Sequence, residues 1–542
     1  MKNYDSIRHV VGESIFIDDV LIPENTLYGY VYYSPIAQGK ILELNFDEAL
    51  RSKGVKGIYS AKDIPGENQI GGIIPDENLF AEEELHFVGH PIAIVVADTY
   101  LHAKEASKKI HAVFEKLTPI LDPRVAAQKN SLIIPPRKFE LGNVDDAWKN
   151  CDYIFEGRVD SGGQEHIYLE TQGAVAIPAE GDSIKVFSAT QGPTAVQRTI
   201  ARILALPMHK VEVNVQRLGG GFGGKEDQAT AWACMAALAA FKLKIPVKLV
   251  LNRQDDIRIT GKRHPYSSDY KIGFNKEGKI LAYEVTFYQN AGASADLSPA
   301  ILDRTLFHCT NAYFIPNVKA TAFSCKTNLV PFTAFRGFGG PQGMFVIQAA
   351  IHRAANELGI SPSDIQKKNL IKENDEFSYG QKAINSFAIK SYKLCEEKFD
   401  LQKLQDEVDE FNSKNFLVKK GLAVMPICFG ISFTTTFLNQ ASALIHIYTD
   451  GSINISTAAV EMGQGVNAKM KRIAAKVLSV DENRIHVDSK NTLRVANTSP
   501  TAASKGTDLN GFAVIDACNI LLERLKKVAA LELGEDDWTK IS

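Results

Sequence analysis

Apolar and polar residues along the chain follow two periods, and each period predicts a different kind of element. Short runs rich in Val, Ile and Tyr predict strands at 27–33, 92–97, 211–215, 247–251, 283–288, 320–324, 444–448 and 453–456. Longer stretches with apolar residues three and four apart predict helices at 100–114, 228–243, 344–358, 469–478 and 512–531. Because strands and helices are mixed along the whole chain, the pattern predicts an α/β (α+β mixed) fold.

The same pattern suggests a division into domains. Residues 1–125 are expected to form a separate α/β unit, and prolines between 119 and 136 predict a linker after it. Residues 145–400 form a larger mixed region, and the charge-rich stretch 395–420 predicts a surface helix at a boundary. The last region, 420–542, opens with a predicted hairpin whose turn is Asp450-Gly451.

Glycine-rich loops come directly before several of the predicted helices. They are Gly219-Gly220-Gly221-Phe222-Gly223-Gly224, Gly337-Phe338-Gly339-Gly340 and Glu461-Met462-Gly463-Gln464-Gly465, and a fourth loop, 498–506, is rich in small and hydroxyl residues. The N-terminus of a helix presents unpaired N–H groups and a partial positive charge, and glycine lets a ligand approach the main chain closely. We therefore expect a large anionic ligand that carries phosphate.

The amino-acid composition of the chain limits the functions that it can have. The formal net charge of −2 gives no support for binding of nucleic acid or an anionic membrane. The seven cysteines stand in no CxxC pair, so we expect reduced thiols and no iron–sulfur cluster or zinc ribbon within this chain. The first residues show no signal-peptide pattern, and no apolar run reaches about 18 residues, so we expect a cytoplasmic protein.

The first glycine loop has an alternative interpretation as a dinucleotide site. Gly219, Gly221 and Gly224 satisfy GxGxxG between a predicted strand and a predicted helix, and Asp255 and Asp256 follow the next strand. These acidic residues lie rather far from the loop, and the loop holds more glycine than a dinucleotide turn needs. A purely structural turn is a further alternative.

Charged residues beside the loops are candidates for ligand contacts. Glu226 is expected in the first turn of the helix after the first loop, where it either complements the helix dipole or points into the ligand site. Arg336 comes just before the second loop, where its planar fork suits phosphate or oxo groups. A plain surface arginine is the alternative for Arg336.

Aromatic and amide side chains near the loops are further candidates. Phe338 lies between glycines that offer it no side chains to pack against, so we expect it to be exposed and able to stack on a planar ligand. Phe433 is either a second wall of that site or an ordinary core residue. The amides of Gln191 and Gln464 suit a ligand with oxygen or sulfur acceptors.

The three glycine motifs, extended to Gly219–Glu226, Thr333–Gln342 and Glu461–Gly465, resemble the molybdenum-binding subunit of the xanthine dehydrogenase and aldehyde oxidase family. Further segments look like family motifs: Gly162–Glu170, 259–265 and 87–91. The resemblance covers essentially the whole chain, with the motifs in the same order as in the family. It implies an α/β hammerhead-like N-terminal domain followed by large molybdopterin-binding domains. It also outweighs the dinucleotide interpretation.

The resemblance implies a set of site residues. Positions matching the family's cofactor contacts are Gln191, Gly221, Phe222, Gly223, Arg336, Gly337, Gly463, Gln464, Gly465, Ala502, Ala503 and Ser504. Of these, four match the surroundings of the molybdenum centre: Gln191, Phe222, Arg336 and Ala503. Positions matching substrate contacts are Glu226, Arg304, Phe338, Phe433 and Thr434.

The family hydroxylates a carbon of a heterocycle or an aldehyde with oxygen from water. Aldehyde-oxidising relatives tend to lack the pair that Glu226 and Arg304 represent, so the resemblance implies xanthine or hypoxanthine as substrate. Arg304 is suited to neutralise charge that develops on a remote carbonyl oxygen. An aldehyde or another N-heterocycle remains the alternative substrate. The implied cofactor is molybdopterin, with [2Fe-2S] and FAD on partner subunits that take the electrons.

This sequence departs from the family pattern at two places. Paired glycines usually precede the Glu-Met-Gly-Gln-Gly loop, but here the residues are Ala458-Ala459-Val460. The family's catalytic base is a glutamate in a Gly-Glu-Pro segment, and residues 1–542 contain no Gly-Glu-Pro. We therefore expect no catalytic residue before Ser542, with the base on a missing C-terminal part or on a separate chain. A non-catalytic relic or an assembly protein is the alternative.

Overall fold

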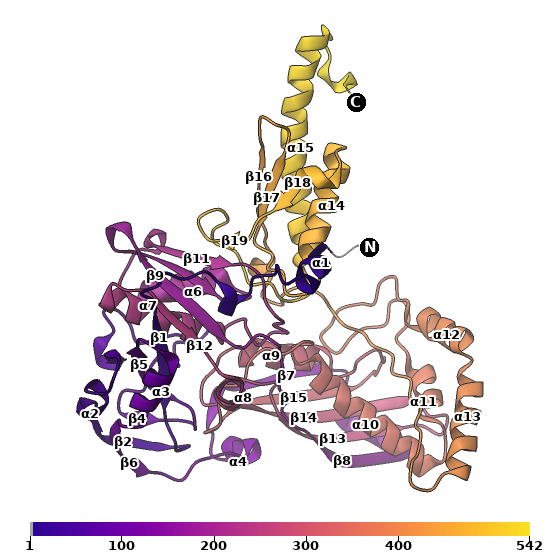
Figure 1. Cartoon of the computed structure of the whole chain (residues 1–542). Helices are drawn as coiled ribbons and strands as arrows, with labels where there is room; N and C mark the ends of the chain where they lie inside the picture. Colours follow the sequence, from indigo (N-terminus) through magenta and orange to yellow (C-terminus); the bar gives the residue numbers. More distant parts are fainter. Residues whose placement is uncertain (1–3, 542) are drawn as a thin grey trace.

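The computed structural model describes residues 4–541. Met1–Asn3, which belong to the segment without a signal-peptide pattern, and Ser542 lie outside the described residues. Figure 1 shows two broad bodies built on β-sheets at the base, and an arm formed by the last part of the chain that projects from them. Among residues 4–541, no helix is both long enough and apolar enough to cross a membrane.

The first body is centred on an eight-stranded mixed sheet. In spatial order its strands are β19 (Lys490–Asn491), β11 (Val211–Val215), β10 (Ser183–Ser188), β9 (Gly173–Ala179), β12 (Val247–Val250), β1 (Leu27–Tyr33), β5 (Pro91–Ala97) and β3 (Val55–Ser60). Helix α7 (Ala229–Leu243) packs on it beside α6 (Pro193–Ile203), and its run of small apolar residues is buried. β1 pairs in parallel with β12, with Leu27 opposite Val247, so the sheet runs across the domain boundary predicted near residue 125.

A smaller three-stranded sheet lies beside it and consists of β4 (Glu84–Leu85), β2 (Gly39–Asn45) and β6 (His111–Lys116), with α2 (Asp47–Leu50) and α3 (Tyr100–Ser107) nearby. The helix predicted over 100–114 is therefore wrong in its last part, which is strand β6. Residues 111–114 alternate between exposed and half-buried positions, and β6 pairs with β2 across about 70 residues of chain. That pairing decides the conformation of a stretch whose local pattern is ambiguous.

The second body is built on a five-stranded sheet. Its strands, in spatial order, are β7 (Leu132–Leu141), β15 (Val318–Lys326), β14 (Ile280–Gly292), β13 (Tyr266–Phe274) and β8 (Tyr153–Ser161). Helices α9 (Ser298–Phe307) and α10 (Gly340–Leu358) pack on it. The linker predicted around Pro135-Pro136 is wrong, because these residues belong to β7. Strand β7 lies at the edge of the sheet, where proline is tolerated.

Surface helices follow the second body. α11 (Pro362–Asn369), α12 (Ala388–Phe399) and α13 (Leu401–Lys414) come in succession, and α13 has no buried residue, in agreement with the predicted surface helix. The remaining short helices are α1 (Tyr4–Val10), α4 (Pro123–Gln128), α5 (Val144–Ala147) and α8 (Arg253–Ile259).

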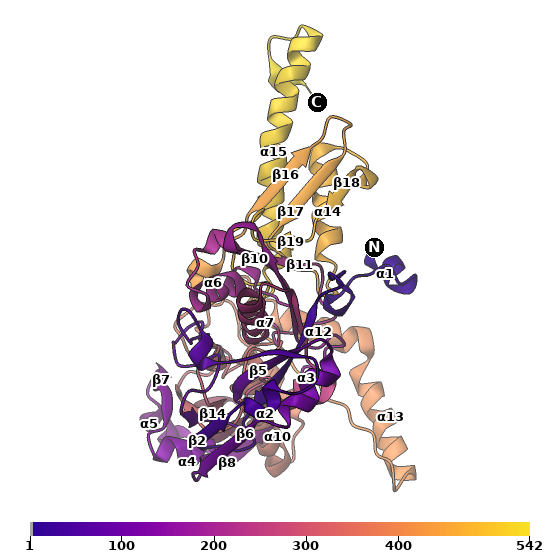
Figure 2. The same cartoon turned by 60° about the vertical axis from the view of Figure 1, so that its left-hand side comes forward.

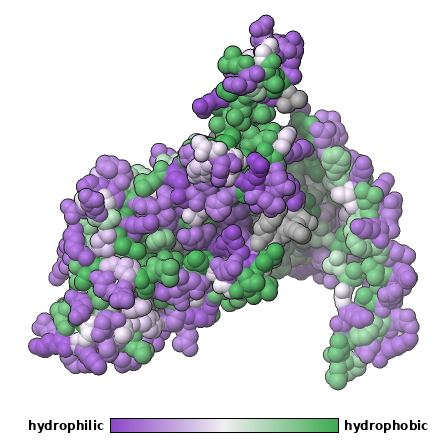
Figure 3. Space-filling view, turned by 45° about the horizontal axis from the view of Figure 1, so that its top comes forward, coloured by the Kyte–Doolittle hydropathy of each residue, from purple (hydrophilic) through white to green (hydrophobic). Residues whose placement is uncertain are grey.

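The projecting arm contains β16 (Ala443–Ile447), β17 (Ile453–Thr457), β18 (Ile485–Val487), α14 (Val466–Leu478) and α15 (Gly506–Leu533). β16 and β17 form the hairpin predicted from Asp450-Gly451. Figure 2 shows α15 extending well beyond the three-stranded sheet. Six large apolar side chains of α15 are exposed: Phe512, Ile520, Leu525, Val528, Leu531 and Leu533. Hydrophobic surface is visible on this arm in Figure 3.

The topology rules against the dinucleotide interpretation of the first glycine loop. β11 and β12, which flank α7 in sequence, are separated in the sheet by β10 and β9, and β9 is antiparallel to both β10 and β12. A dinucleotide-binding unit instead places its parallel strands around a helix crossover in a mainly parallel sheet. The helix α7 also begins only at Ala229, so Glu226 lies in a turn before the helix and not in its first turn.

Candidate functional site

Gln191 joins the first glycine loop to the fourth loop. Its side-chain Oε1 accepts a hydrogen bond from the Gly223 N–H at 2.9 Å, and its Nε2 donates to the Thr501 carbonyl at 3.0 Å. Its main chain also bonds to Thr501 and to Lys225, at 2.9 and 2.7 Å. Gln191 is buried, with an exposed fraction of 3%. Segments about 280 residues apart in sequence therefore meet at one amide side chain.

The second loop packs directly on the first. The Arg336 N–H donates to the Phe222 carbonyl at 2.8 Å. A Cβ added to Gly223 would lie 2.7 Å from the carbonyl oxygen of Ala334, so this contact requires glycine. The side chains of Phe222 and Arg336 are both exposed. Two predicted molybdenum-centre residues are thus brought together, and their side chains are accessible to a ligand.

The first loop offers main-chain donors. Within residues 4–541, the N–H groups of Gly220, Gly221 and Phe222 have no hydrogen-bond acceptor. Gly220 and Phe222 have positive φ angles of 94° and 56°. Successive N–H groups in such a conformation form a concavity that binds anionic or oxo groups. This geometry fits an oxygen-rich anionic ligand.

A buried ion pair supports the first loop from below. Lys225 is fully buried, and its Nζ lies 2.8 Å from a carboxylate oxygen of Glu170. Glu170 also accepts hydrogen bonds from the N–H groups of Gly219 and Ile17, each at 2.9 Å. Burial lowers the pKa of Lys225, whereas the Glu170 carboxylate raises it. Both residues lie in the family-like motifs Gly162–Glu170 and Gly219–Glu226, but their role could not be predicted because their contact appears only in the fold.

The third loop is shaped by its own glutamate. The carboxylate of Glu461 accepts hydrogen bonds from the N–H groups of Gly463, Gly465 and Asn467, each at 3.0 Å. Gln464 donates to the Val460 carbonyl at 2.8 Å and accepts from the Met462 N–H at 2.7 Å. N–H groups that we expected to face a ligand therefore bind Glu461. Open space surrounds both glycines, because a Cβ added to either would meet nothing within 4 Å.

The unusual Ala458-Ala459-Val460 segment joins the third loop to the rest of the site. All three residues are buried, and the Val460 N–H donates to the Thr501 hydroxyl at 2.8 Å. The carbonyl of Glu461 accepts from the N–H of Leu218, just before the first loop, at 2.9 Å. The departure from paired glycines therefore leaves the third loop in contact with the first and fourth loops.

Glu226 is buried beside the first loop, with an exposed fraction of 3%. Burial and, to a lesser extent, the neighbouring Asp227 carboxylate raise its pKa to about 8, and Lys505 opposes the shift. Glu226 is therefore largely protonated at neutral pH and able to donate a hydrogen bond. Lys505, which sequence reasoning missed, donates to the carbonyls of Leu438 and Gln440 at 2.7 and 3.2 Å.

Arg304, on α9, fixes the segment that precedes Phe433. Its guanidinium donates to the carbonyl oxygens of Gly430 and Ser432 and lies 5.2 Å from the ring centroid of Phe429. The Ser432 N–H in turn donates to the carbonyl of Ala503 at 2.8 Å. Arg304 is buried, and burial lowers its pKa. A predicted substrate residue is thus linked through one segment to the fourth loop.

The predicted aromatic walls differ in their surroundings. Phe338 is half-buried and packs against Leu297 and Ile301, so the expectation that it has no packing partner is wrong. Its partners come from a distant segment that the loop sequence does not reveal. Phe433 lies under Lys505, whose Nζ is 4.9 Å from the ring centroid. Within residues 4–541 the two phenylalanine rings make no contact with each other, and Thr434 is exposed.

The remaining cofactor candidates lie on the same loops. Gly337 has a φ of 96°, and Ala503 and Ser504 have φ angles of 55° and 56° just before α15 begins. Ala502 is half-buried in this loop. In the described part of the chain, no group of three His, Cys, Asp or Glu side chains is placed to hold a metal ion. The donors that do converge are main-chain N–H groups, amides and Arg336, which suit the oxygen atoms of an anionic cofactor.

Family models match most of the chain. The model described as "Aldehyde oxidase and xanthine dehydrogenase, a/b hammerhead domain" matches residues 11–118. The models described as "Molybdopterin cofactor-binding domain" match residues 125–370 and 394–540. The hammerhead model agrees with the predicted N-terminal domain type, and the other two agree with the predicted molybdopterin-binding domains.

Relatives of known name are similar over the full length of this chain. Xanthine dehydrogenase/oxidase of Gallus gallus is 41% identical over 543 residues, which are 100% of this chain and 40% of that protein. Xanthine dehydrogenase 1 of Arabidopsis thaliana is 41% identical over 96% of this chain and 39% of its own length. The chain therefore spans about 40% of the length of the relatives it matches.

Solved structures share the fold. Quinoline 2-oxidoreductase from Pseudomonas putida 86 aligns with a TM-score of 0.87 and 23% identity, over 99% of this chain and 71% of that chain. The aldehyde oxidoreductase from Desulfovibrio gigas aligns with a TM-score of 0.85 and 23% identity, over 96% and 59% of the two chains. The solved structures share the fold, and the family models and the relatives establish that the chain belongs to the xanthine dehydrogenase and aldehyde oxidase family, with its hammerhead and molybdopterin-binding domains.

Proposed function

We propose that this chain is the molybdenum-cofactor-binding part of a purine hydroxylase that oxidises hypoxanthine or xanthine. One observation carries the proposal. Glu226 and Arg304 are both buried, and both are connected to the segment around Phe433 and to the fourth loop. Arg304 binds the carbonyls of Gly430 and Ser432, and Glu226 interacts electrostatically with Lys505, which lies over Phe433. A protonated carboxyl group and a guanidinium both offer hydrogen-bond donors that complement the polar edges of a purine.

The residues present fit the cofactor that the family binds. Gln191, the free N–H groups of 220–222 and the exposed guanidinium of Arg336 supply hydrogen-bond donors. When bound, the molybdenum cofactor supplies the two-electron oxidant and the oxygen that derives from water. The chain's part is to hold that group through main-chain and amide donors and to keep its reactive face toward the substrate.

Within this scheme the chain orients the substrate and stabilises charge on it. Protonated Glu226 donates a hydrogen bond to a ring nitrogen or carbonyl of the purine. The guanidinium of Arg304 donates two hydrogen bonds to main-chain carbonyls, and its positive charge is proposed to stabilise charge that develops on a carbonyl oxygen of the substrate. Phe338 and Phe433 are the proposed flat contacts for the ring.

We place the remaining functions on other parts of the protein. The catalytic base is proposed to be a glutamate outside residues 1–542, and electrons are proposed to leave through [2Fe-2S] and FAD-binding partners in the cytoplasm. The exposed apolar side chains of α15 favour an interface with another domain or subunit on the arm, since exposed patches of this kind mark interfaces.

The test is xanthine-dependent dye reduction with molybdenum analysis, on protein purified from its native source with all polypeptides that accompany it. We expect stoichiometric molybdenum, turnover of xanthine, and a Gly-Glu-Pro segment in the purified material. Glu226→Gln and Arg304→Met should each lower turnover of xanthine while leaving the molybdenum content unchanged. Molybdenum with turnover of aldehydes alone would transfer the proposal to that substrate class. Absence of both molybdenum and turnover would overturn it in favour of a relic.

A further inference from the structure

Lys505 is a buried cation that no carboxylate binds directly. It lies in the fourth loop just before α15 begins, with an exposed fraction of 4%. Within residues 4–541 it forms no ion pair, and Glu226 attracts it only from a distance. The buried Lys225, in contrast, is paired with Glu170 at 2.8 Å. Because an unpaired buried charge costs free energy, the role of Lys505 follows from its other contacts.

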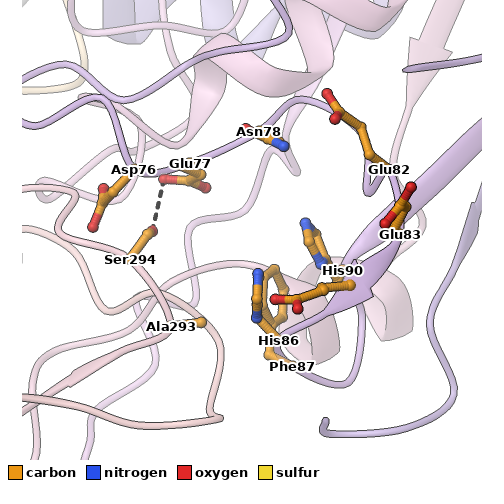
Figure 4. Close-up of a pocket in the computed structure, with 11 residues that line it drawn as sticks. Asp76, Glu77, Asn78, Glu82, Glu83, His86, Phe87, His90, Ala293 and Ser294 are labelled. Carbon is orange, nitrogen blue, oxygen red and sulfur yellow. Dashed lines mark hydrogen bonds between the residues drawn. The ribbon is translucent and has the colours of Figure 1, made fainter. Parts of the chain in front are cut away.

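Acidic side chains gather in another part of the molecule. Five carboxylates line a cavity of about 260 Å³ between residues 76–90 and the pair Ala293-Ser294, where Glu77 accepts a hydrogen bond from the Ser294 hydroxyl (Figure 4). Among the described residues that line this cavity, none belongs to the four loops. Its carboxylates therefore do not supply a counter-charge to Lys505.

The ammonium of Lys505 holds one turn of the main chain. Its Nζ donates to the carbonyl of Leu438 at 2.7 Å and to the carbonyl of Gln440 at 3.2 Å. It also donates to the hydroxyl oxygen of Ser499, in the fourth loop. These three acceptors match the three N–H donors of an ammonium. The two carbonyls lie on either side of Asn439, so Lys505 fixes the main chain around that residue.

The side chain of Asn439 connects this turn to Phe433. Its Oδ1 accepts a hydrogen bond from the Phe433 N–H at 2.9 Å, and its Nδ2 donates to the Phe433 carbonyl at 2.9 Å. Both polar atoms of one amide thus bind the main chain of one residue. The Nζ of Lys505 also lies over the ring of Phe433, 4.9 Å from its centroid, where a cation is attracted to the ring. Lys505 therefore acts on Phe433 directly at the ring and indirectly through Asn439.

We propose that Lys505 is a positioning residue of the substrate site: through the turn at 438–440 it holds the ring of Phe433 in place. This role rests on the proposed function, in which Phe433 is a flat contact for a purine. Arg304 binds two carbonyls that precede Phe433 in sequence, and Lys505 binds two that follow it, so a cation holds the segment on each side. A binding residue has to be held within about 0.5 Å of its productive position, and these two anchors restrain Phe433 in that way.

The test is calorimetric titration with urate, on wild-type and variant proteins purified with their accompanying subunits. Urate is a purine with no C–H bond left to hydroxylate, so its binding is measured without turnover. Lys505→Met keeps a side chain of similar length but removes the donors, so it should weaken urate binding about tenfold. It should raise the KM for xanthine by a similar factor and leave kcat and the molybdenum content nearly unchanged.

Hydrogen exchange and a matched control complete this test. Exchange of the Phe433 N–H should be about tenfold faster in Lys505→Met than in the wild type, because the turn that carries its acceptor is released. The control is Lys527→Met, which removes a lysine of α15 that also lies over an aromatic ring, 5.1 Å from the centroid of Trp538. It should leave both urate binding and exchange at Phe433 unchanged.

A second variant covers the case in which Lys505→Met fails to fold. Asn439→Ala leaves Lys505 in place and removes both hydrogen bonds to Phe433, so it should also weaken urate binding and accelerate exchange at Phe433. The double variant should bind urate about as weakly as Asn439→Ala alone, because both residues act through Phe433. A general structural role of Lys505 would instead give losses that multiply.

The outcomes separate this role from the proposed function. Multiplying losses, or unchanged exchange at Phe433 in Lys505→Met, would overturn the role of Lys505. Failure of the wild-type protein to bind urate would overturn the purine site, and hydrogen exchange would still decide whether Lys505 holds Phe433.

Discussion

The first and third glycine loops each contain a glycine with nearly the same positive φ angle, but the two glycines have opposite surroundings. Gly223 has a φ of 101° and Gly463 a φ of 103°. A side chain at Gly223 would meet the main chain of Ala334 at 2.7 Å, whereas one at Gly463 would meet nothing within 4 Å. The first loop lies in a densely packed body, and the third lies at the base of the arm.

The difference teaches that a loop for an anionic ligand can be organised in two ways. Neighbouring segments hold the first loop, through Gln191 and Arg336. The third loop holds itself, because Glu461 binds three of its own N–H groups. The conformation of a loop that neighbouring segments hold depends on the packing of the whole body. The conformation of a loop that its own carboxylate holds depends on that one residue.

The contributions of Glu226 and Lys490 to the stability of the folded protein should change with pH in opposite directions. The pKa of Glu226 is raised to about 8 in the folded protein, so its contribution to stability falls as pH rises from about 4.5 to 8. Lys490 is a buried residue of β19 whose Nζ donates to the side-chain oxygen of Asn467 in the arm at 3.2 Å. Its pKa is lowered to about 8, so its contribution to stability rises as pH increases from 8 to about 10.5. Each pKa unit corresponds to about 1.4 kcal/mol, so each change amounts to several kcal/mol.

Denaturant unfolding at a series of pH values measures these slopes. Glu226→Gln should flatten the slope below pH 8, and Lys490→Gln should flatten the slope above it. An unchanged slope in either variant would show that the residue does not titrate as its burial requires.

Substitution of matched glycines should separate packing from backbone strain. We expect Gly223→Ala to lower the free energy of unfolding by about 4 kcal/mol, because strain at positive φ adds to overpacking against Ala334. Gly463→Ala carries the strain alone and should cost about 1–2 kcal/mol. Urea denaturation of both variants measures the difference. Equal losses would refute the contrast between the two loops.

Removal of the internal carboxylate should loosen only the third loop. We expect Glu461→Ala to cost about 2 kcal/mol, because three N–H groups lose their acceptor. Hydrogen exchange at Gly463, Gly465 and Asn467 should accelerate at least tenfold, while Gly223 stays protected. The control is Glu523→Ala, which breaks only an exposed pair with Lys527. Faster exchange at Gly223 would mean that the two loops are not independent.

The smallest effect is expected on the exposed face of the arm. Leu531, on α15, is 81% exposed. Leu531→Lys should change the free energy of unfolding by less than about 0.5 kcal/mol and should reduce self-association measured by light scattering. A loss above about 1 kcal/mol would indicate that this face is covered when the protein is purified.

Local patterns predicted much of this fold. The strands at 27–33 and 211–215 and the helix at 228–243 agree with the structure, because their periods are strong and undisturbed. The strand at 111–116 was missed, since its short alternating pattern becomes a strand only through pairing with β2. The edge strand that contains Pro135-Pro136 was missed because proline is a loop signal everywhere except at such an edge.

For a similar reason, the sequence predicted some residues of the candidate site but not the contacts that they make. The motifs identified Gln191 and Arg336, and the structure places both beside the first loop. No local signal reveals that Lys505 reaches Phe433, or that Glu461 binds the N–H groups of its own loop. These contacts depend on how distant segments or successive turns pack against one another in the folded chain. The spacing of residues along the sequence does not reveal that packing.

The parallel pairing of β1 with β12 has a consequence for synthesis of the protein. Leu27 and Val247 are partners in the sheet but are made far apart in time. At roughly 5–20 residues per second, a ribosome needs on the order of 10–40 s to extend the nascent chain from the first to the second. During that interval one edge of β1, which is rich in tyrosine, has no native partner and is open to pairing with other nascent chains. The yield of folded protein should therefore depend on translation speed and on chaperones that shield this edge.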